Sequence, residues 1–277
     1  MLAVIVPANN EEAVIGMCLR SVALAAGSPC LHGEPVLVIV VLDTCTDDTA
    51  GAAAQAGALL ISVQARNVGI ARDAGAQLAL SLGARWLAFT DADTVVAPDW
   101  LHVQMSLCSD AVCGTVSVTD WGAYGEPMRR HFAATYTDSD GHQHIHGANL
   151  GVSAQAYQRA GGFAPLASSE DVALVRALEA VGARIAWSAA PRVVTSARSA
   201  FRAPGGFGAT LGRVGREHEV ALLTVERVPE THDSIAQSAR NHNDFEGRSR
   251  LGISDITYCI VVAFGVPNAT LVALKIC

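Results

Sequence analysis

The chain has 277 residues, of which 51% are hydrophobic and 16% are charged. This balance supplies enough apolar surface for a folded core and excludes an intrinsically disordered chain. Basic residues number 19 against 26 acidic ones, which gives a net charge of −7, and Lys275 is the single lysine. Because binding to a nucleic-acid backbone needs clustered lysine and arginine, nucleic acid is disfavoured as a partner. If the protein binds a phosphate group, cationic groups at the binding site itself must supply the positive charge.

Short apolar runs alternate with helical patterns through the first third of the chain. Solid apolar strands separated by helices are typical of βαβ units in a parallel sheet that is covered on both faces. We therefore predict an α/β fold with a mostly parallel central sheet and helices on both faces. The first run follows Met1 without a basic region, so we interpret it as a strand and not as a signal peptide. The predicted strands are residues 2–6, 36–42, 59–63 and 86–89, and the clearest helical patterns are residues 14–22 and 70–82.

The second half of the chain carries weaker patterns. Residues 119–146 are rich in Asp, Gly, His and aromatic side chains, which indicates an irregular insertion of the kind that carries specificity. Serines at 153 and at 168–169 are expected to open two helices, because serine is a favoured N-cap residue. The predicted helices are residues 100–107, 153–161 and 170–181, and the predicted strands are residues 111–118, 184–187 and 193–197.

The C-terminal region contains an apolar segment at residues 256–274 that is broken by Gly265, Pro267 and Asn268. A membrane span needs about 20 predominantly apolar residues, a length that this interrupted segment only just reaches. Peripheral contact with a membrane is therefore favoured over a span. The odd number of cysteines, without metal-site spacing, indicates reduced thiols and a cytoplasmic protein, with membrane association through residues 256–274 as the alternative to a purely soluble one.

Two aspartates, Asp91 and Asp93, follow the predicted strand at residues 86–89. Open α/β sheets bind ligands at the carboxyl ends of their strands. In an extended chain, residues two apart point to the same side, so both carboxylates are expected to face one site. Such a pair suits Mg²⁺ or Mn²⁺, which prefer oxygen ligands and often share them with substrate phosphates. The alternative is a turn that happens to contain two acids.

Polar residues also follow the other three predicted strands, as a nucleotide site in a doubly wound sheet requires. The alternative is helix capping, because Asn9 with Glu12 resembles a capping box and Asp47 or Asp48 could cap the next helix. Recurrence at successive strand ends favours the nucleotide site. The polar groups are residues 9–12, Asp43 and residues 67–72.

Taken in chain order, these motifs resemble the family 2 glycosyltransferases of the GT-A fold, over about residues 2–212. The resemblance implies a Rossmann-like sheet and an enzyme that moves a sugar from a nucleotide-diphosphate sugar to a hydroxyl acceptor, usually with inversion. Several ordered motifs carry it, which lowers the risk attached to any short pattern. The matching stretches are residues 4–12, 42–49, 67–72, 91–93, 147–150, 161–163 and 170–171.

The resemblance also assigns roles to individual residues. Asp93, together with Asp91, would hold Mn²⁺ or Mg²⁺ on the diphosphate. Many members carry an aromatic residue where Asn9 stands, and that residue stacks on the base. The residues expected to bind the nucleotide are Pro7, Ala8, Glu11, Asp43, Arg72 and Asp91.

Glu170 and Asp171 match the acidic pair from which the family draws its catalytic base, and Asp171 is the stronger candidate. An inverting transfer needs one carboxylate to take the proton of the acceptor hydroxyl while the diphosphate departs. The alternative is structural, because acids in the first turn of a helix interact favourably with the helix dipole.

Three histidines, His142, His144 and His146, precede Gly147. In an extended strand they would share a face, which leaves a zinc site as one interpretation and an acceptor-side surface as the other. The resemblance places His146, Gly147 and Asn149 on the donor-sugar or acceptor side. The resemblance also implies one domain at residues 1–212, with a nucleotide-binding half at 1–95 and an acceptor half at 96–212. The remaining residues, 213–277, form a tail of unknown role.

Other classes of protein share single features of this sequence. Residues 86–94 fit the signature of haloacid-dehalogenase-like phosphohydrolases, in which Asp91 would be the nucleophile and Asp93 an acid or base. That family opens with this motif and needs a later phosphate-binding lysine, whereas here three βα units come first. A dinucleotide oxidoreductase fits less well, because residues 69–75 are not G-x-G-x-x-G. A non-catalytic module that binds nucleotide sugars is the remaining alternative.

Overall fold

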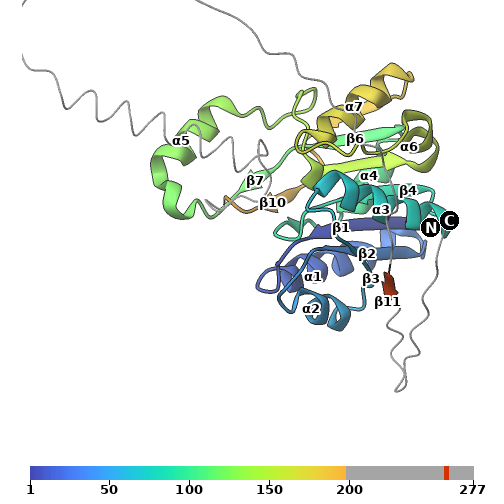
Figure 1. Cartoon of the computed structure of the whole chain (residues 1–277). Coiled ribbons are helices and arrows are strands. Elements are labelled where there is room, and N and C mark those ends of the chain that lie inside the picture. Colours follow the sequence, from blue (N-terminus) through green and yellow to red (C-terminus); the bar gives the residue numbers. More distant parts are fainter. Residues whose placement is uncertain (198–258, 262–277) are drawn as a thin grey trace, which may run out of the picture.

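A mostly parallel sheet forms the centre of the computed structural model, which describes residues 1–197 and 259–261 (Figure 1). Its strand order in residues 1–197 is β3-β2-β1-β4-β8-β6-β9, and β11 (Cys259–Val261) pairs antiparallel with β3 at the edge. The predicted α/β class is confirmed. The strands are β1 (Leu2–Ala8), β2 (Val36–Asp43), β3 (Leu59–Val63), β4 (Trp86–Phe89), β6 (Ala111–Gly114), β8 (Leu150–Ser153) and β9 (Ile185–Ser188).

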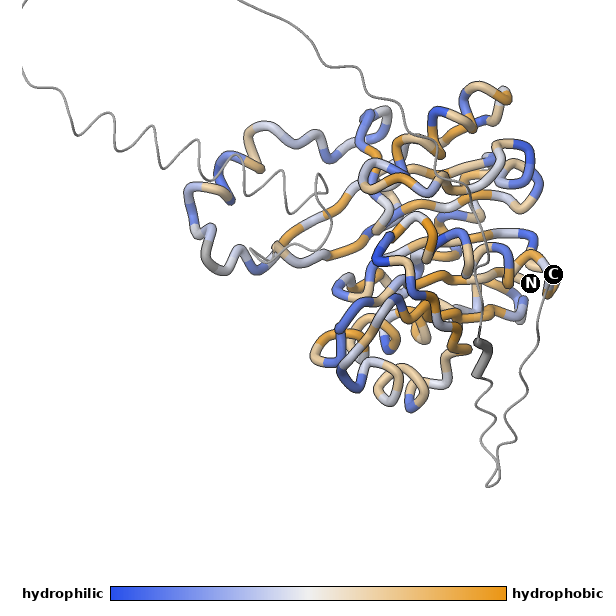
Figure 2. Tube along the Cα trace, in the orientation of Figure 1, coloured by the Kyte–Doolittle hydropathy of each residue, from blue (hydrophilic) through white to orange (hydrophobic). Residues whose placement is uncertain are grey.

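Helices cover both faces of this sheet because successive residues of a strand point to opposite sides. Val4 and Val6 pack on one side with helices α1, α2 and α4, whereas Ala3 and Ile5 pack on the other with α3, α6 and α7. Figure 2 shows hydrophobic stretches in both the strands and the helices of this layered body. The helices are α1 (Ile15–Ala26), α2 (Thr49–Gln55), α3 (Val68–Ser81), α4 (Trp100–Ser106), α6 (Ala154–Ala160) and α7 (Glu170–Ala180).

Small residues bring α3 close to the sheet. A Cβ atom on Gly75 would lie 2.6 Å from Cγ2 of Ile5, so no larger side chain fits there without displacing the helix. Ala71 and Ala74 on the same face are also buried. This close packing carries the first turns of α3, including Arg72, to the carboxyl end of the strands.

An arm projects from the body and is built around a second sheet with strand order β5-β10-β7 (Figure 1). Helix α5 (Gly125–Thr135) follows β7, and Trp121, Met128 and Ala197 form a small core of their own beside it. The strands are β5 (Val95–Val96), β7 (Ser117–Val118) and β10 (Val193–Thr195).

The structure corrects two predictions for the second half of the chain and adds one strand that was not predicted. The insertion at residues 119–146 is not wholly irregular, because it contains α5, and the strand predicted at 111–118 divides into β6 and β7 in different sheets. Strand β8 lacked a prediction of its own, and it pairs antiparallel between β4 and β6. A four-residue strand that is mostly buried shows no alternation of polar and apolar residues by which it could be recognised.

The caps predicted at Asp48 and Ser153 are confirmed, and the one predicted at Ser169 is wrong. Asp48 accepts a hydrogen bond from the Gly51 N–H, and Ser153 accepts one from the Ala156 N–H. Ser169 precedes α7 in the left-handed conformation, with φ of 59°, and its side chain caps no N–H group. The acidic residues at the start of α7 make tertiary contacts instead, and these are described below.

None of the helices within residues 1–197 combines the length and the hydropathy that crossing a bilayer requires. The tail predicted at 213–277, with its apolar segment at 256–274, lies outside the described residues apart from β11.

Candidate functional site

The loops that follow β1 and β2 are joined by hydrogen bonds at the carboxyl edge of the sheet. The Asn9 amide donates to the Asp43 carbonyl over 2.6 Å, and Asn10 Oδ1 accepts from the Thr46 N–H over 2.7 Å. Two backbone N–H groups on these loops add further bonds, from Glu11 to the Thr49 hydroxyl and from Asp48 to the Glu12 carboxylate. The two loops therefore form one rigid rim.

This arrangement contradicts the capping box proposed for Asn9 and Glu12, because α1 begins after Val14 and has no side-chain cap. Both side chains instead bond to the loop after β2, a partner far away in sequence. Pro7 and Ala8 are the last two residues of β1 and lie at the same rim.

Asp43 organises the connection between β3 and α3. Its carboxylate accepts hydrogen bonds from the backbone N–H groups of Ala65, Arg66 and Asn67 at 2.8–2.9 Å. The Thr44 hydroxyl adds a fourth bond at 2.9 Å. These bonds account for the burial of Asp43, and a contact from its carboxylate to a nucleotide base stays a prediction.

Arg72 lies at the centre of a buried ionic cluster, with only 4% of its surface exposed. One guanidinium nitrogen bonds to Glu170, and another lies 2.5 Å from Oδ1 of Asp91. Burial raises the pKa of Glu170, and the neighbouring Asp171 and Asp91 raise it further, while Arg72 opposes the shift. Three elements that are distant in sequence, namely α3, the end of β4 and the start of α7, meet in this cluster.

Asp91 and Asp93 stand in a turn, not in an extended segment. The Thr94 N–H donates to the Asp91 carbonyl over 3.0 Å and closes the turn, so the predicted strand alternation does not apply here. Both side chains are half-buried. Within the described residues, Asp91 pairs with Arg72 through Oδ1, and Oδ2 is the oxygen that this ion pair leaves to a ligand.

The two acidic residues at the start of α7, Glu170 and Asp171, have different partners. Glu170 is 5% exposed and points to Arg72, whereas Asp171 is half-buried and bonds to a different segment. Asp171 Oδ2 accepts a hydrogen bond from the Gly147 N–H over 2.9 Å. Glu170 is therefore occupied as an ionic partner, and Asp171 is the member of the pair that could meet an acceptor.

Gly147 opens a single 3-10 turn, η3 (Gly147–Asn149), that lies against Arg72. A Cβ atom at position 147 would lie 2.4 Å from Arg72 Cζ, so any larger residue there would displace the Arg72 guanidinium group. Asn149 is 0% exposed, and its amide donates to the carbonyls of Thr115 and Pro191 and accepts from the Trp100 indole. Both amide hydrogens are thus used inside the core, and a place for Asn149 on the donor-sugar or acceptor side stays a prediction.

The three histidines do not form a metal site. Their rings stack, with centroids 5.5 Å apart for His142 and His144 and 6.0 Å apart for His144 and His146. Within the described part of the chain, no three His, Cys, Asp or Glu side chains are grouped to hold an ion, so the zinc interpretation is wrong. His146 Nε2 lies 2.9 Å from the hydroxyl of Tyr136, a residue that sequence reasoning missed because it stands in the insertion without a motif.

Comparisons with known proteins agree with this geometry. A family model described as Glycosyl transferase family 2 matches residues 3–160. Among solved structures, the chain resembles TarS 1–349 of S. aureus in complex with UDP-GlcNAc, with 17% identity and a TM-score of 0.56 over 77% of this chain and 65% of that one. A search of curated proteins found no match.

Two further solved structures have the same fold. The mannosyltransferase PcManGT from Pyrobaculum calidifontis, solved with GDP-Man and Mn²⁺, has 19% identity and a TM-score of 0.52 over 83% of this chain and 65% of that one. Glucosyl-3-phosphoglycerate synthase from Mycobacterium tuberculosis, solved with Mn²⁺, UDP and phosphoglyceric acid, has 20% identity and a TM-score of 0.50 over 83% and 80%. This chain spans less than two thirds of the length of TarS 1–349. These likenesses show the GT-A fold.

The family match decides between the alternatives left open by the aspartate pair. It begins at residue 3 and includes Asp91 and Asp93 after three βα units, whereas a dehalogenase-like phosphohydrolase would open with that motif. The match covers more than half of the 277 residues and the whole carboxyl edge from β1 to β4. The chain therefore belongs to glycosyl transferase family 2.

Proposed function

We propose that this chain transfers a sugar from a nucleotide-diphosphate sugar to a hydroxyl acceptor, with inversion at the anomeric carbon. The observation that carries the proposal is the ionic cluster of Arg72, Asp91 and Glu170, because it joins the aspartate turn to the start of α7. The Gly147 N–H then orients Asp171 next to that cluster. Solved structures of the same fold hold UDP-GlcNAc and GDP-Man, which supports the donor class.

In this proposal Asp171 is the catalytic base. Its carboxylate takes the proton of the acceptor hydroxyl as that oxygen bonds to the anomeric carbon, and the bond to the nucleotide diphosphate breaks with both electrons leaving on the diphosphate. A single displacement inverts the configuration. His146 and Gly147 would flank the sugar, and residues 1–95 and 96–212 would act as the nucleotide and acceptor halves. The nucleoside would lie against Pro7, Ala8, Glu11, Asp43 and the side of Arg72.

A divalent cation, Mn²⁺ or Mg²⁺, fits the aspartate turn. Asp91 Oδ2 and the carboxylate of Asp93 are hard oxygen donors of the kind that both ions prefer. No group of three candidate ligands occurs within the described residues, so the remaining ligands would come from the diphosphate and from water, as is usual for Mg²⁺. When bound, the cation supplies the positive charge that stabilises the departing diphosphate.

A thermal-shift panel of nucleoside diphosphates, each with and without Mn²⁺, tests nucleotide binding. We expect at least one nucleoside diphosphate to raise Tm in the presence of Mn²⁺, because a ligand that binds only the folded state stabilises it by about 2.7 kcal/mol at 100 times its Kd. For a protein of this size that is a rise of roughly 5–10 °C. The matching nucleosides without phosphate are the control. The proposal fails if no nucleotide gives a metal-dependent shift.

Replacing Asp93 by Asn tests the metal site. We expect Asp93→Asn to abolish the Mn²⁺-dependent part of the shift and to lower transfer from the donor by roughly 100-fold, because the cation contributes several kcal/mol of charge stabilisation. Asp99→Asn is the matched control, because Asp99 is exposed and its side chain makes no cap hydrogen bond to α4. If the thermal shifts of the two variants depended equally on Mn²⁺, Asp93 would not be a ligand of the cation.

Turnover separates an enzyme from a non-catalytic module. Transfer, or slow hydrolysis, of the nucleotide sugar whose nucleotide binds in the panel is expected from the wild-type chain. Saturable binding with no release of nucleoside diphosphate, over a broad set of hydroxyl acceptors, would favour the module instead.

A further inference from the structure

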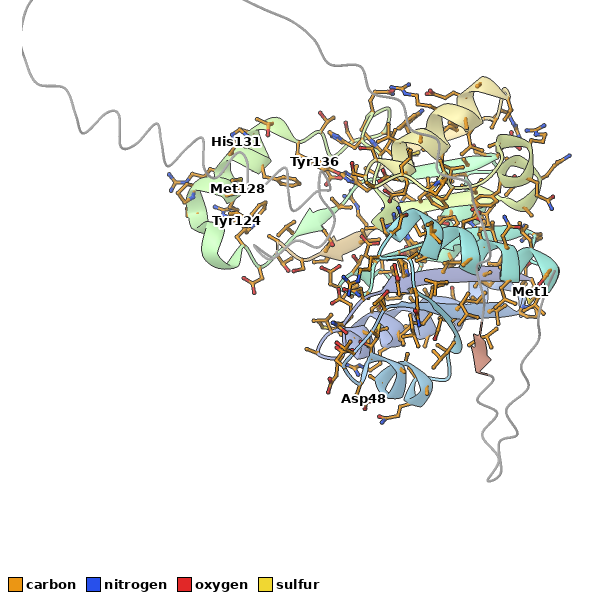
Figure 3. All side chains as sticks on the ribbon, in the orientation of Figure 1. Met1, Asp48, Tyr124, Met128, His131 and Tyr136 are labelled. Atoms are coloured by element: carbon orange, nitrogen blue, oxygen red, sulfur yellow. The ribbon has the colours of Figure 1, made fainter. Side chains whose placement is uncertain are left out.

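Tyr136 stands where the projecting arm joins the body, directly after α5 (Figure 3). Its ring is packed between two others, with centroids 4.4 Å from Phe132 and 4.1 Å from His144 and nearly parallel planes. Neither face is therefore open to a sugar ring. What Tyr136 can offer the site is its hydroxyl group.

That hydroxyl bridges two segments. It accepts a hydrogen bond from the Val116 N–H over 2.9 Å, in the connection between β6 and β7. Its own proton can be donated to His146 Nε2, also at 2.9 Å, in the tautomer whose neutral imidazole carries its proton on Nδ1. The bridge fixes the ring of His146 relative to the central sheet.

The peptide group between His146 and Gly147 is held on both sides. The His146 carbonyl accepts from the Asn149 N–H over 3.0 Å, and the Gly147 N–H donates to Asp171 Oδ2 over 2.9 Å. Arg72 blocks movement on one side, because it fills the space that a Cβ atom of Gly147 would need. A change in the position of His146 therefore changes the direction of the Gly147 N–H group, and this N–H group orients Asp171.

We propose that Tyr136 is a positioning residue for Asp171, acting through His146 and the Gly147 N–H. The inference rests on the proposed role of Asp171 as the base. The competing explanation is purely structural: the hydroxyl would only satisfy the Val116 N–H, and Asp171 would not respond to its loss.

The bridge keeps its protons through the neutral pH range. Burial lowers the pKa of His146 to about 3, His144 and His142 lower it as well, and only Asp91 acts in the opposite sense. Burial raises the pKa of Tyr136 to about 12. The titratable groups that face His146 are thus Tyr136, His142, His144 and Asp91.

The test uses the full chain labelled with ¹⁵N at glycine and follows the Gly147 amide by NMR as the pH is changed. A hydrogen bond to a carboxylate moves an amide proton downfield, so this signal reports the protonation of Asp171. Asp171→Asn identifies the signal, because its pH dependence must disappear in that variant. In Tyr136→Phe we expect the amide to move upfield and its pH-dependent shift to fall by at least half.

Tyr157→Phe is the matched control. The Tyr157 hydroxyl also accepts from a backbone N–H, that of Phe163, and donates to an acid, Asp73, but it does not contact His146. We expect the Gly147 signal of this variant to equal that of the wild type. An unchanged Gly147 signal in Tyr136→Phe, or the same change in both variants, would overturn the inference.

Two further variants decide the case if Tyr136→Phe does not fold. His146→Gln retains an acceptor for the Tyr136 hydroxyl and must keep the Gly147 signal, whereas His146→Leu must lose its pH dependence. With a donor identified by the nucleotide panel, Tyr136→Phe should lower kcat roughly tenfold and leave the donor KM within about twofold. Because the NMR experiment requires no turnover, failure of the proposed transferase activity and failure of the positioning role are separate outcomes.

Discussion

Asp171→Asn is expected to lower kcat by roughly 100-fold to 10,000-fold, the range that a positioned general base contributes. The asparagine side chain is nearly isosteric, and its carbonyl oxygen can still accept from the Gly147 N–H. The variant therefore keeps the geometry of the site and loses only the capacity to take a proton. The measurement is steady-state release of nucleoside diphosphate, together with the nucleotide thermal shift, which should be unchanged.

Glu179→Gln is the matched control for this variant. Glu179 lies in the last turns of the same helix, is exposed and pairs with Arg176 at 2.7 Å. The kcat of Glu179→Gln should equal that of the wild type. A kcat for Asp171→Asn within a factor of two of wild type would require another base, and the buried Glu170, held by Arg72, would be a poor replacement.

Arg72→Met is expected to have the largest effect on stability. It leaves Glu170, which is 5% exposed, without its cationic partner, and breaking a buried ion pair on one side costs about 3–5 kcal/mol. The methionine stem fills part of the volume but supplies no hydrogen-bond donor. Urea unfolding at pH 8 measures the loss in the free energy of unfolding.

The loss should depend on pH. Burial already raises the pKa of Glu170 in the native protein, and removal of Arg72 takes away the group that opposes this shift. The folded variant then binds a proton more tightly than the unfolded chain, so its stability falls as pH rises from the unfolded value of about 4.3 through the raised folded value. We therefore expect Arg72→Met to be less destabilised at pH 5 than at pH 8.

Arg85→Met is the control for the loss of an arginine from an ion pair. The Arg85 side chain is 57% exposed and binds Glu34 at the opposite end of β4, so we expect a change within about 1 kcal/mol and little dependence on pH. If Arg72→Met were no more destabilising than Arg85→Met, the cluster would not hold α3 and α7 together.

Much of the fold follows from local pattern. The four runs at 2–6, 36–42, 59–63 and 86–89 became β1 to β4 because parallel strands buried on both faces are continuously apolar over a few residues. The caps at Asp48 and Ser153 were also predictable, since the acceptor and the N–H group lie within three residues of each other. Strand β8 was not, because its four residues are too few to show a period. Helix α5 was not either, because it is polar overall and buries only Met128.

The candidate site was predictable as a set of strand ends but not as a set of contacts. Ligands bind at the carboxyl edge of an α/β sheet, and this rule alone predicts that residues 9–12, Asp43 and Asp91 share one site. It could not distinguish the buried Asn149, which is used inside the core, from Asp171, which is half-buried. Burial of a polar side chain depends on which segments pack around it.

The strands β1 to β4 and the polar residues that follow them are properties of segments a few residues long, so they could be predicted from the sequence. The division of labour between Glu170 and Asp171 depends on Arg72, which is 98 positions from Glu170 in the chain. The link from Tyr136 to Asp171 likewise crosses from the arm to α7 through His146 and Gly147. Hydrogen bonds and ion pairs between distant segments exist only once the sheet and its helices have packed, which is why folding and not local pattern assigns these side chains their tasks.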